Sequence, residues 1–571
     1  MPTTAIKTAK PAAPAVTASH SGLQLSAYRG DGAVLLAFNL KDAPKAGFAG
    51  FAVKCTPPSG KTFYLKNRLT FDKPVTSVTT PAQRHAQLTG TDQAPYQKFR
   101  WIDFSSSQGP GVYAYEVSDL YHGKNGALKP RATTSVSINL GPFVSGSLQV
   151  GFTRGFLSSQ AYVDRFHNAP IRPDKKSIDY DTKPYQAQYT WLGFHARELM
   201  FNFLNQALAD PQSELDVFAY DLDEPDIISL LKQFKSRLRA VLDNAPLHTK
   251  PGAMEILAKQ LLLESAGASN IKTGHFQRFS HCKVFILKKG GKPVRVLTGS
   301  TNFSVRGLYA QANNVLVFDD AETAGYYSHA FDQAFEDMPN FAKSEIAEGW
   351  IDVSNEPGLP PFSVSFSPHK TADVSLDRVA QAIQKAKSSI LFAIMELGGS
   401  GPVLSQIQAL TSKRKDLFSY GVTQSLSGTS VYKPGSPNGV LTAFSFLQKH
   451  VPAPFSQEIS GGPGQVIHDK FVVIDFDTKN PLVYTGSSNL AAGGEEQNGD
   501  NLLEIRDPAV ASIFAVQGMG LVDHFHFRSV MQTATDDKPL ELDPTDGWWK
   551  DYFVKSSLKF RDRNLFSPLS A

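Results

Sequence analysis

The sequence has little cysteine and little net charge. Its 571 residues include only two cysteines, Cys55 and Cys282, which we expect to lie in different domains. This argues against a disulfide scaffold and is compatible with a reducing compartment. The formal net charge is only +4, well short of the basic surplus typical of nucleic-acid-binding domains, although a localised basic stripe stays open.

Long hydrophobic runs are also missing. No stretch is long enough to span a bilayer, and the first residues are rich in Ala, Pro, Thr and Lys without the apolar core of a signal peptide. We therefore expect residues 1–21 to form a flexible tail and the protein to be soluble and cytoplasmic. Export by a route that needs no cleaved signal stays open.

What the chain does contain is a normal globular composition and an N-terminal region rich in short β patterns. A length of 571 residues predicts two or three domains. Within residues 22–145, runs such as "GAVLLAFNL" and "GVYAYEVSDLY" alternate with turn residues, and Tyr113, Tyr115 and Val117 share one strand face. This predicts a small all-β sandwich, which loosely resembles a fibronectin type III domain. No catalytic cluster occurs in it.

After this region the predicted secondary structure changes from short strands to alternating helices and strands. Helical patterns such as "FHARELMFNFLNQAL", "EPDIISLLKQFKSRLRAVL" and "SLDRVAQAIQKAKSS" alternate with apolar strand patterns such as "ELDVFAY" and "ILFAIMEL". Helix–strand alternation predicts α/β layers.

A repeat with a constant offset of 187 residues marks this part of the chain. "HCKVFIL" aligns with "HDKFVVI", and "TGSTNFS" with "TGSSNLA", without a gap. The matching residues are His281 and His468, Lys283 and Lys470, Gly299 and Gly486, Ser300 and Ser487, Asn302 and Asn489, and Asn314 and Asn501. Two copies at one offset imply a duplicated domain.

The spacing within each copy indicates phosphate chemistry. Residues i and i+2 of a strand share a face, so His281 should lie beside Lys283, and His468 beside Lys470. A second strand then delivers Ser and Asn to the same end of the sheet. Lysine supplies a cation, Ser and Asn supply hydrogen bonds, and histidine can attack or carry a proton. One such motif is usually structural, but two at one offset predict a catalytic pair.

These motifs resemble those of the phospholipase D superfamily, whose signature is a duplicated His-x-Lys, four residues, Asp, and then Gly-Ser-x-Asn. The second copy has Asp475 in place, whereas the first has Lys288 there. The resemblance implies an α/β fold of two phospholipase D-like halves around one cleft, at 146–345 and at 346–571 with a C-terminal extension. We expect the first half to be active despite its incomplete motif.

The resemblance also implies a mechanism. His281 would attack phosphorus to form a phosphohistidine, His468 would protonate the leaving oxygen, and water or an alcohol would release the product. Lys283, Lys470, Asn302 and Asn489 would hold the phosphate oxygens, with Ser300, Ser487 and Asp475 in support. No cofactor or metal is expected, because the lysines supply the positive charge.

Other polar clusters have weaker claims. Asp221, Asp223 and Glu396 end strands and could orient a histidine, although capping or turn roles are equally compatible. Glu495, Glu496 and Asp500 are acids of the kind that hold cations and could lie on the rim of the cleft, although the pattern favours a solvated loop. His524 and His526 could suggest a metal site, but they do not converge on a helix, which favours a surface or packing role.

The substrate stays open at this level. Two unequal motifs suit a phospholipid, with hydrolysis or transfer of the phosphatidyl group, and contact with a membrane would then be transient. A nuclease acting on DNA or RNA is the alternative, and a catalytically inactive phosphate-binding or interaction protein is a third. We expect a monomer without a stable protein partner.

Overall fold

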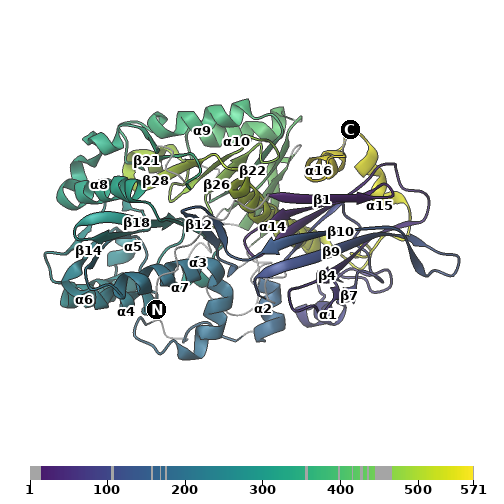
Figure 1. Cartoon of the computed structure of the whole chain (residues 1–571), viewed down its shortest axis with the longest axis horizontal. Helices are drawn as coiled ribbons and strands as arrows, with labels where there is room; N and C mark the ends of the chain where they lie inside the picture. Colours follow the sequence, from purple (N-terminus) through teal and green to yellow (C-terminus); the bar gives the residue numbers. More distant parts are fainter. Residues whose placement is uncertain are drawn as a thin grey trace.

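Large β-sheets with helices packed against them organise the protein (Figure 1). The computed structural model describes residues 14–569 apart from 105–108, 156–158, 168, 174–176, 354–357, 396–398, 415, 425–427, 434–435 and 444–465. The predicted α/β class is confirmed. Among the described helices, none is both long and apolar enough to cross a membrane.

The N-terminal region consists of two four-stranded sheets over a shared core. One has the order β1(Ala15–His20), β2(Leu23–Arg29), β3(Val34–Leu40), β8(Arg100–Asp103), and the other β10(Leu128–Leu140), β9(Gly111–His122), β4(Phe48–Thr56), β5(Phe63–Tyr64). Short strands β6(Lys66–Asn67) and β7(Thr89–Gly90) and helix α1(Pro81–Ala86) complete it. Tyr113, Tyr115 and Val117 are all buried, as their alternation predicts.

The predicted N-terminal tail is wrong over its last residues. β1 begins at Ala15 and pairs along its whole length with β2, because the apolar residues Val16 and Ala18 pack against the core of the two sheets. Residues 1–13 lie outside the described part of the chain. The likeness to fibronectin type III domains and the domain boundaries stay predictions.

The C-terminal segment packs against the N-terminal sheets, so the two ends of the chain form one unit (Figure 1). It contains α15(Gly547–Lys550), η7(Asp551–Phe553) and α16(Leu558–Phe566). The Trp548 ring lies 5.2 Å from that of Phe48, and its Nε1 donates to the Phe48 carbonyl at 3.1 Å. Arg100 of β8 donates to Asp562 of α16 at 2.8 Å and to Asp523.

Two large sheets of similar topology fill the rest of the molecule. The first has the order β11(Phe143–Ser145), β12(Leu148–Phe152), β19(Asn314–Phe318), β18(Lys292–Gly299), β17(Val284–Lys289), β13(Ser213–Ala219), β14(Leu238–Asp243), β15(Ile271–Gly274). The second has β20(Trp350–Val353), β21(Phe362–Ser367), β28(Asn498–Ile505), β27(Leu482–Gly486), β26(Phe471–Ile474), β22(Ser389–Ile394), β23(Phe418–Gln424), β24(Gly428–Lys433), β25(Ser436–Ala443). In each, an inner pair is parallel, β13 with β14 and β22 with β23, and the next strand on the motif side, β17 or β26, is antiparallel to it.

The helices follow the same repeat. α8(Ala321–Asp337) and α14(Pro508–Thr533) begin 187 residues apart, and each is capped by the carboxylate before it, Asp320 or Asp507. α14 is the more buried because it lies between the second sheet and the N-terminal sheets, where it contacts β2 (Figure 1). The other α-helices are α2(Ser159–Phe166), α3(Gln186–Leu208), α4(Pro225–Gln233), α5(Pro246–Thr249), α6(Met254–Ala266), α7(Val305–Tyr309), α9(Asp373–Lys385), α10(Pro402–Lys413) and α13(Ala492–Gln497).

One predicted helix is half wrong. The pattern over residues 224–242 forms a helix only to Gln233, and Leu238 starts strand β14. β14 is paired in parallel on both sides, with β13 and β15. A strand buried on both faces has a continuous apolar run that periodicity alone does not distinguish from a helix.

The packing of the C-terminal segment gives a first prediction. Trp548→Ala should lower the free energy of unfolding by about 3–5 kcal/mol, because it empties a buried aromatic site. Chemical denaturation followed by circular dichroism measures this. Trp549→Ala is the matched control, since Trp549 is only partly buried against the same core, and it should cost clearly less. Equal losses would mean that the Phe48 contact is not what holds the segment.

Candidate active site

Each catalytic-motif histidine is held by the sheet to which it does not belong. Residues Phe279 and Ser280 form β16, which pairs with β28 of the second sheet, and the His281 N–H donates to Gly499 O at 2.9 Å. Reciprocally, the His468 N–H donates to Ala312 O at 3.0 Å, next to β19 of the first sheet. Both motifs therefore cross between the sheets just before strands β17 and β26, which start only after Lys283 and Lys470.

The imidazole rings are held in the same crossed manner. His281 Nδ1 lies 2.7 Å from Asp500 Oδ1, and His468 Nδ1 lies 2.8 Å from Asn313 Oδ1. Asn313 and Asp500 are themselves 187 residues apart. Asn313 Nδ2 donates to Gly307 O, which fixes the amide so that its oxygen faces His468. Each Nδ1 must then donate, so Nε2 is the nitrogen left for chemistry in a neutral ring.

The two histidines differ in the charge of their partners. Burial lowers the pKa of His281, whereas the Asp500 carboxylate acts in the opposite direction. Burial lowers the pKa of His468 well below its ordinary value, and the charges of Lys470 and Lys283 add to this effect, without a carboxylate to oppose them. The pair is therefore chemically unequal, with an ionic partner for the first ring and a neutral partner for the second.

The two lysines form a buried cationic centre. Lys283 and Lys470 each donate to the carbonyl of their own motif histidine. Burial lowers the pKa of Lys283 to about 8. Burial, followed by the charge of Lys283, lowers the pKa of Lys470 well below its usual value. Two buried ammonium groups that repel each other are suited to an anion that both can reach.

The Gly-Ser-x-Asn turns have the same local geometry in both copies. Ser300 N donates to Asn314 O and Ser487 N to Asn501 O, both at 3.1 Å. Gly299, with φ of 137°, must be glycine, because a Cβ there would collide with the Asn314 carbonyl. The two serines thus brace the turns against β19 and β28, as supporting residues would.

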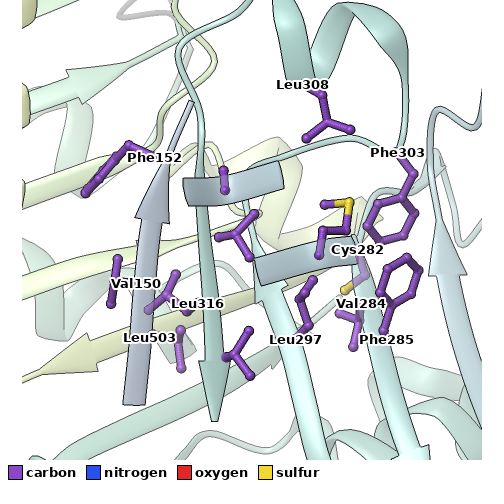
Figure 2. Packing of buried hydrophobic residues seen from close by; sticks show 14 of the residues in the cluster. Val150, Phe152, Cys282, Val284, Phe285, Leu297, Phe303, Leu308, Leu316 and Leu503 are labelled. Atoms are coloured by element: carbon purple, nitrogen blue, oxygen red, sulfur yellow. The ribbon is translucent and has the colours of Figure 1, made fainter. Parts of the chain in front are cut away.

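The asparagines at the ends of these turns have buried polar atoms. Asn302 Nδ2 donates to Asp221 Oδ2 at 2.6 Å, and Phe303, the next residue, stacks on Phe285 at 4.1 Å (Figure 2). The Oδ1 atoms of Asn302 and Asn489 are buried and have no hydrogen-bond partner among the described residues. Such groups are costly unless a ligand or water satisfies them.

Packing explains why the first motif has Lys288 where the second has an acid. That acid, Asp475, is not part of the site. Asp475 accepts the N–H groups of Lys387 and Ser388 at 2.9 and 2.8 Å, at the entry to β22. At the equivalent position Lys288 forms a buried ion pair with Asp216 of β13. The structure therefore does not bring Asp475 to the histidines, and we correct its supporting role to a structural one.

Asp500 and Glu495 also differ from their predicted solvated loop. Both are buried, Asp500 against His281 and Glu495 against Ser375. Asp500 lies on β28, and only the 187-residue spacing from Asn313 could have indicated it. Glu396 lies outside the described residues.

A second polar cluster lies beside the first motif. His248 Nε2 is 2.9 Å from Asp221 Oδ1 and its Nδ1 is 2.7 Å from Asp243 Oδ2. Although burial would lower it, these hydrogen bonds raise the pKa of His248 to about 10. Donor atoms of Asp221, His248 and Glu255 lie within 4.8 Å of one another and could hold a metal ion. The sequence analysis missed His248, which no repeat or motif marks.

The position of the missing acid yields a second prediction. Lys288→Asp, which completes the sequence motif, should not raise activity and should lower stability by about 3–5 kcal/mol, because it places a carboxylate against buried Asp216. Thermal or chemical unfolding, together with turnover of any cleaved phosphodiester, measures both effects. Asp475→Ala is the companion variant and should lose stability while its kcat is kept. A large gain of activity in Lys288→Asp would contradict this assignment.

Comparison with solved structures gives distant likenesses. The chain is similar to the phosphatidylserine synthase of Haemophilus influenzae Rd KW20, at 13% identity and a TM-score of 0.37 over 60% of this chain and 86% of that one. It is similar to Nuc, a phospholipase D family member of Salmonella typhimurium, at 20% identity and a TM-score of 0.20 over 24% and 86%. It is similar to yeast tyrosyl-DNA phosphodiesterase, at 11% identity and a TM-score of 0.27 over 52% of this chain and 84% of that one. No curated protein matches the sequence.

Residues 379–517 match the family model described as "Cardiolipin synthase, PLD-like domain". This stretch contains His468, Lys470 and Asn489, the residues whose arrangement is repeated at His281, Lys283 and Asn302. Over this stretch the chain is similar to the phospholipase D-like domain that the family model describes.

Proposed function

We propose that this protein is a phosphodiesterase in which two phospholipase D-like halves form one active site and the reaction passes through a phosphohistidine. The observation that carries the proposal is the crossed holding of the histidines, His281 by Asp500 and His468 by Asn313. This arrangement ties both rings to the boundary between the sheets, where the charge of Lys283 acts on Lys470 and on His468.

In the first step, His281 Nε2 attacks the phosphorus of a bound diester. A bond from nitrogen to phosphorus forms while the bond from phosphorus to the leaving oxygen breaks. His468, which takes up a proton once the negative charge of the bound diester offsets that of the lysines, gives this proton to the leaving oxygen. Asp500 stabilises the positive charge that develops on the attacking ring, a role that an amide could not fill. Lys283, Lys470 and the two asparagines hold the remaining phosphoryl oxygens, and their ammonium charge offsets the charge of the substrate.

In the second step, the roles reverse. His468, now neutral, takes a proton from water or an alcohol, whose oxygen attacks phosphorus as the bond to His281 breaks. This returns His281 to its neutral form and His468 to its protonated form. Dividing one difficult displacement into two in-line steps is the advantage of the covalent intermediate.

We favour a phospholipid as substrate, cleaved by hydrolysis or by transfer of the phosphatidyl group. The unequal partners of the two histidines support a substrate whose two ends differ, with a fixed leaving side. A nuclease acting on DNA or RNA is the alternative. A phosphate-binding protein without catalysis, the third reading, would not need a carboxylate on one histidine only.

A trapping experiment tests this proposal. Phosphatidylcholine vesicles, single-stranded DNA, duplex DNA and RNA are given separately to wild type, His281→Ala and His468→Ala, with and without EDTA. Either variant should lose about 10³-fold or more in kcat, because the residues act as a unit. His468→Ala, quenched with denaturant at alkaline pH to preserve the nitrogen–phosphorus bond, should accumulate the substrate's phosphoryl group, with its remaining ester, on His281, detected by mass spectrometry. Full turnover by His281→Ala would refute the mechanism. The substrate that is cleaved decides between a phospholipase and a nuclease.

The pH dependence gives a separate prediction. Lys283 and Lys470 must be protonated to hold the phosphate, and burial lowers the pKa of both, that of Lys283 to about 8, so kcat/KM should be lost by the time the pH has risen through about 8. Because the Asp500 charge raises the pKa of Lys283, Asp500→Asn should move this alkaline limb to lower pH. Asp475→Asn, the same chemical change away from the site, should leave it in place. An unmoved limb in Asp500→Asn would assign it to another group.

A further inference from the structure

A large cavity lies where the N-terminal sheets meet the α/β body, apart from the His-Lys-Asn residues. Its volume is about 650 Å³, within the range of small-molecule sites. Its walls come from residues 63–104 of the N-terminal region, from the segments around Arg154 and Trp191, and from α14 between Gly520 and Arg528. Aromatic rings, including Trp101 and Trp191, form much of this lining.

The charge in this cavity is unbalanced. Six cationic side chains line it, whereas the described lining contains only two carboxylates, Asp103 and Asp523. Both carboxylates are already engaged, Asp103 by the Tyr115 hydroxyl at 2.8 Å and Asp523 by Arg100. The cationic residues are Lys66, Arg68, Lys98, Arg154, Arg165 and Arg528.

Arg154 is a cation of this lining that has an unpaired side-chain nitrogen. Its side chain lines the cavity and the residue is only 7% exposed, yet its Nη2 has no hydrogen-bond partner among the described residues. The guanidinium stacks on the Phe194 ring, 3.7 Å from its centroid. Phe194 has φ of 45° inside α3, a strained conformation for an aromatic residue, and this kink places the ring there.

A buried guanidinium nitrogen without a hydrogen-bond acceptor is unfavourable unless a ligand or water supplies one. Burying a charge costs several kcal/mol, and native structures normally offset this with a paired anion. Ring stacking satisfies the face of the guanidinium but not its N–H groups, which point along its edge. Burial lowers the pKa of Arg154 to about 10, an effect that the charge of Asp31 opposes and that of Arg165 strengthens. The Asp31 carboxylate oxygens are taken up by the Phe152 N–H and by His195 Nδ1.

We propose that this cavity is a binding site for a small organic phosphate, whose phosphate group pairs with Arg154 and whose apolar or aromatic body lies against the tryptophans. A phosphate fits better than a single carboxylate because several further cations line the same cavity, and arginine binds its oxygens through two parallel hydrogen bonds. The aromatic lining accommodates either a nucleobase or an alkyl chain. The site is separate from the catalytic one and does not depend on the proposed reaction.

Calorimetry on the full-length protein tests the site. Probes are AMP, with an aromatic body, decyl phosphate, with an alkyl body, and inorganic phosphate and adenosine as half-ligands. All titrations use a Lys283→Met/Lys470→Met background, which removes both ammonium groups proposed to hold a phosphate at the catalytic residues. We expect AMP or decyl phosphate to bind more tightly than either half-ligand, and Arg154→Met to weaken that binding about tenfold or more. Whether AMP or decyl phosphate binds more tightly shows whether the apolar part of the ligand is aromatic or alkyl.

A stability measurement separates binding from folding. Without ligand, Arg154→Met should be at least as stable as the parent, since it removes a buried unpaired charge while its stem still covers Phe194. The matched control is Arg131→Met, which removes an exposed arginine that also lies over a ring, that of Tyr121, and should leave binding unchanged. Two results would overturn the proposal: no probe whose binding depends on Arg154, or a melting temperature for Arg154→Met well below that of Arg131→Met.

Discussion

The crossed hydrogen bonds between the two large sheets are the constraint on which the site depends. Neither His281 nor His468 is positioned by its own sheet alone. Backbone bonds to Gly499 and Ala312 place the two segments, and Asp500 and Asn313 orient the two rings. A single half would therefore present a histidine whose tautomer and direction are not fixed. The duplication thus supplies each motif histidine with its ring partner from the other sheet.

The same boundary concentrates charge that the fold must tolerate. Two ammonium groups, two imidazoles and Asp500 are buried together, and desolvation is the largest influence on the pKa of each. Such a cluster works against stability, so the stabilising contacts lie elsewhere. α14, the apolar cores of both sheets and the buried pairing of Arg100 with Asp523 and Asp562 supply them. Activity and stability are thus assigned to different parts of the molecule.

Much of this architecture could be predicted from the sequence. The strands around both motifs and helices such as α9 follow from local patterns, and the repeat predicted a duplicated domain. The crossing could not be predicted, because a strand pattern does not say which sheet will bind the residues before it. For the same reason Asp500 was assigned to a solvated loop, and only its spacing from Asn313 marked it. Lys288 shows the converse. It departs from the sequence motif, and its charge is balanced by Asp216, which lies on a strand distant in sequence.

The crossing also limits how the active site can move. Many two-lobed enzymes admit substrate by rotating one lobe about a hinge. Here each lobe carries the other's histidine support, so any rotation between the sheets would misalign both rings at once, and in opposite senses. Opening between the two sheets would therefore break the hydrogen bonds that orient the two imidazole rings and so dismantle the proposed site.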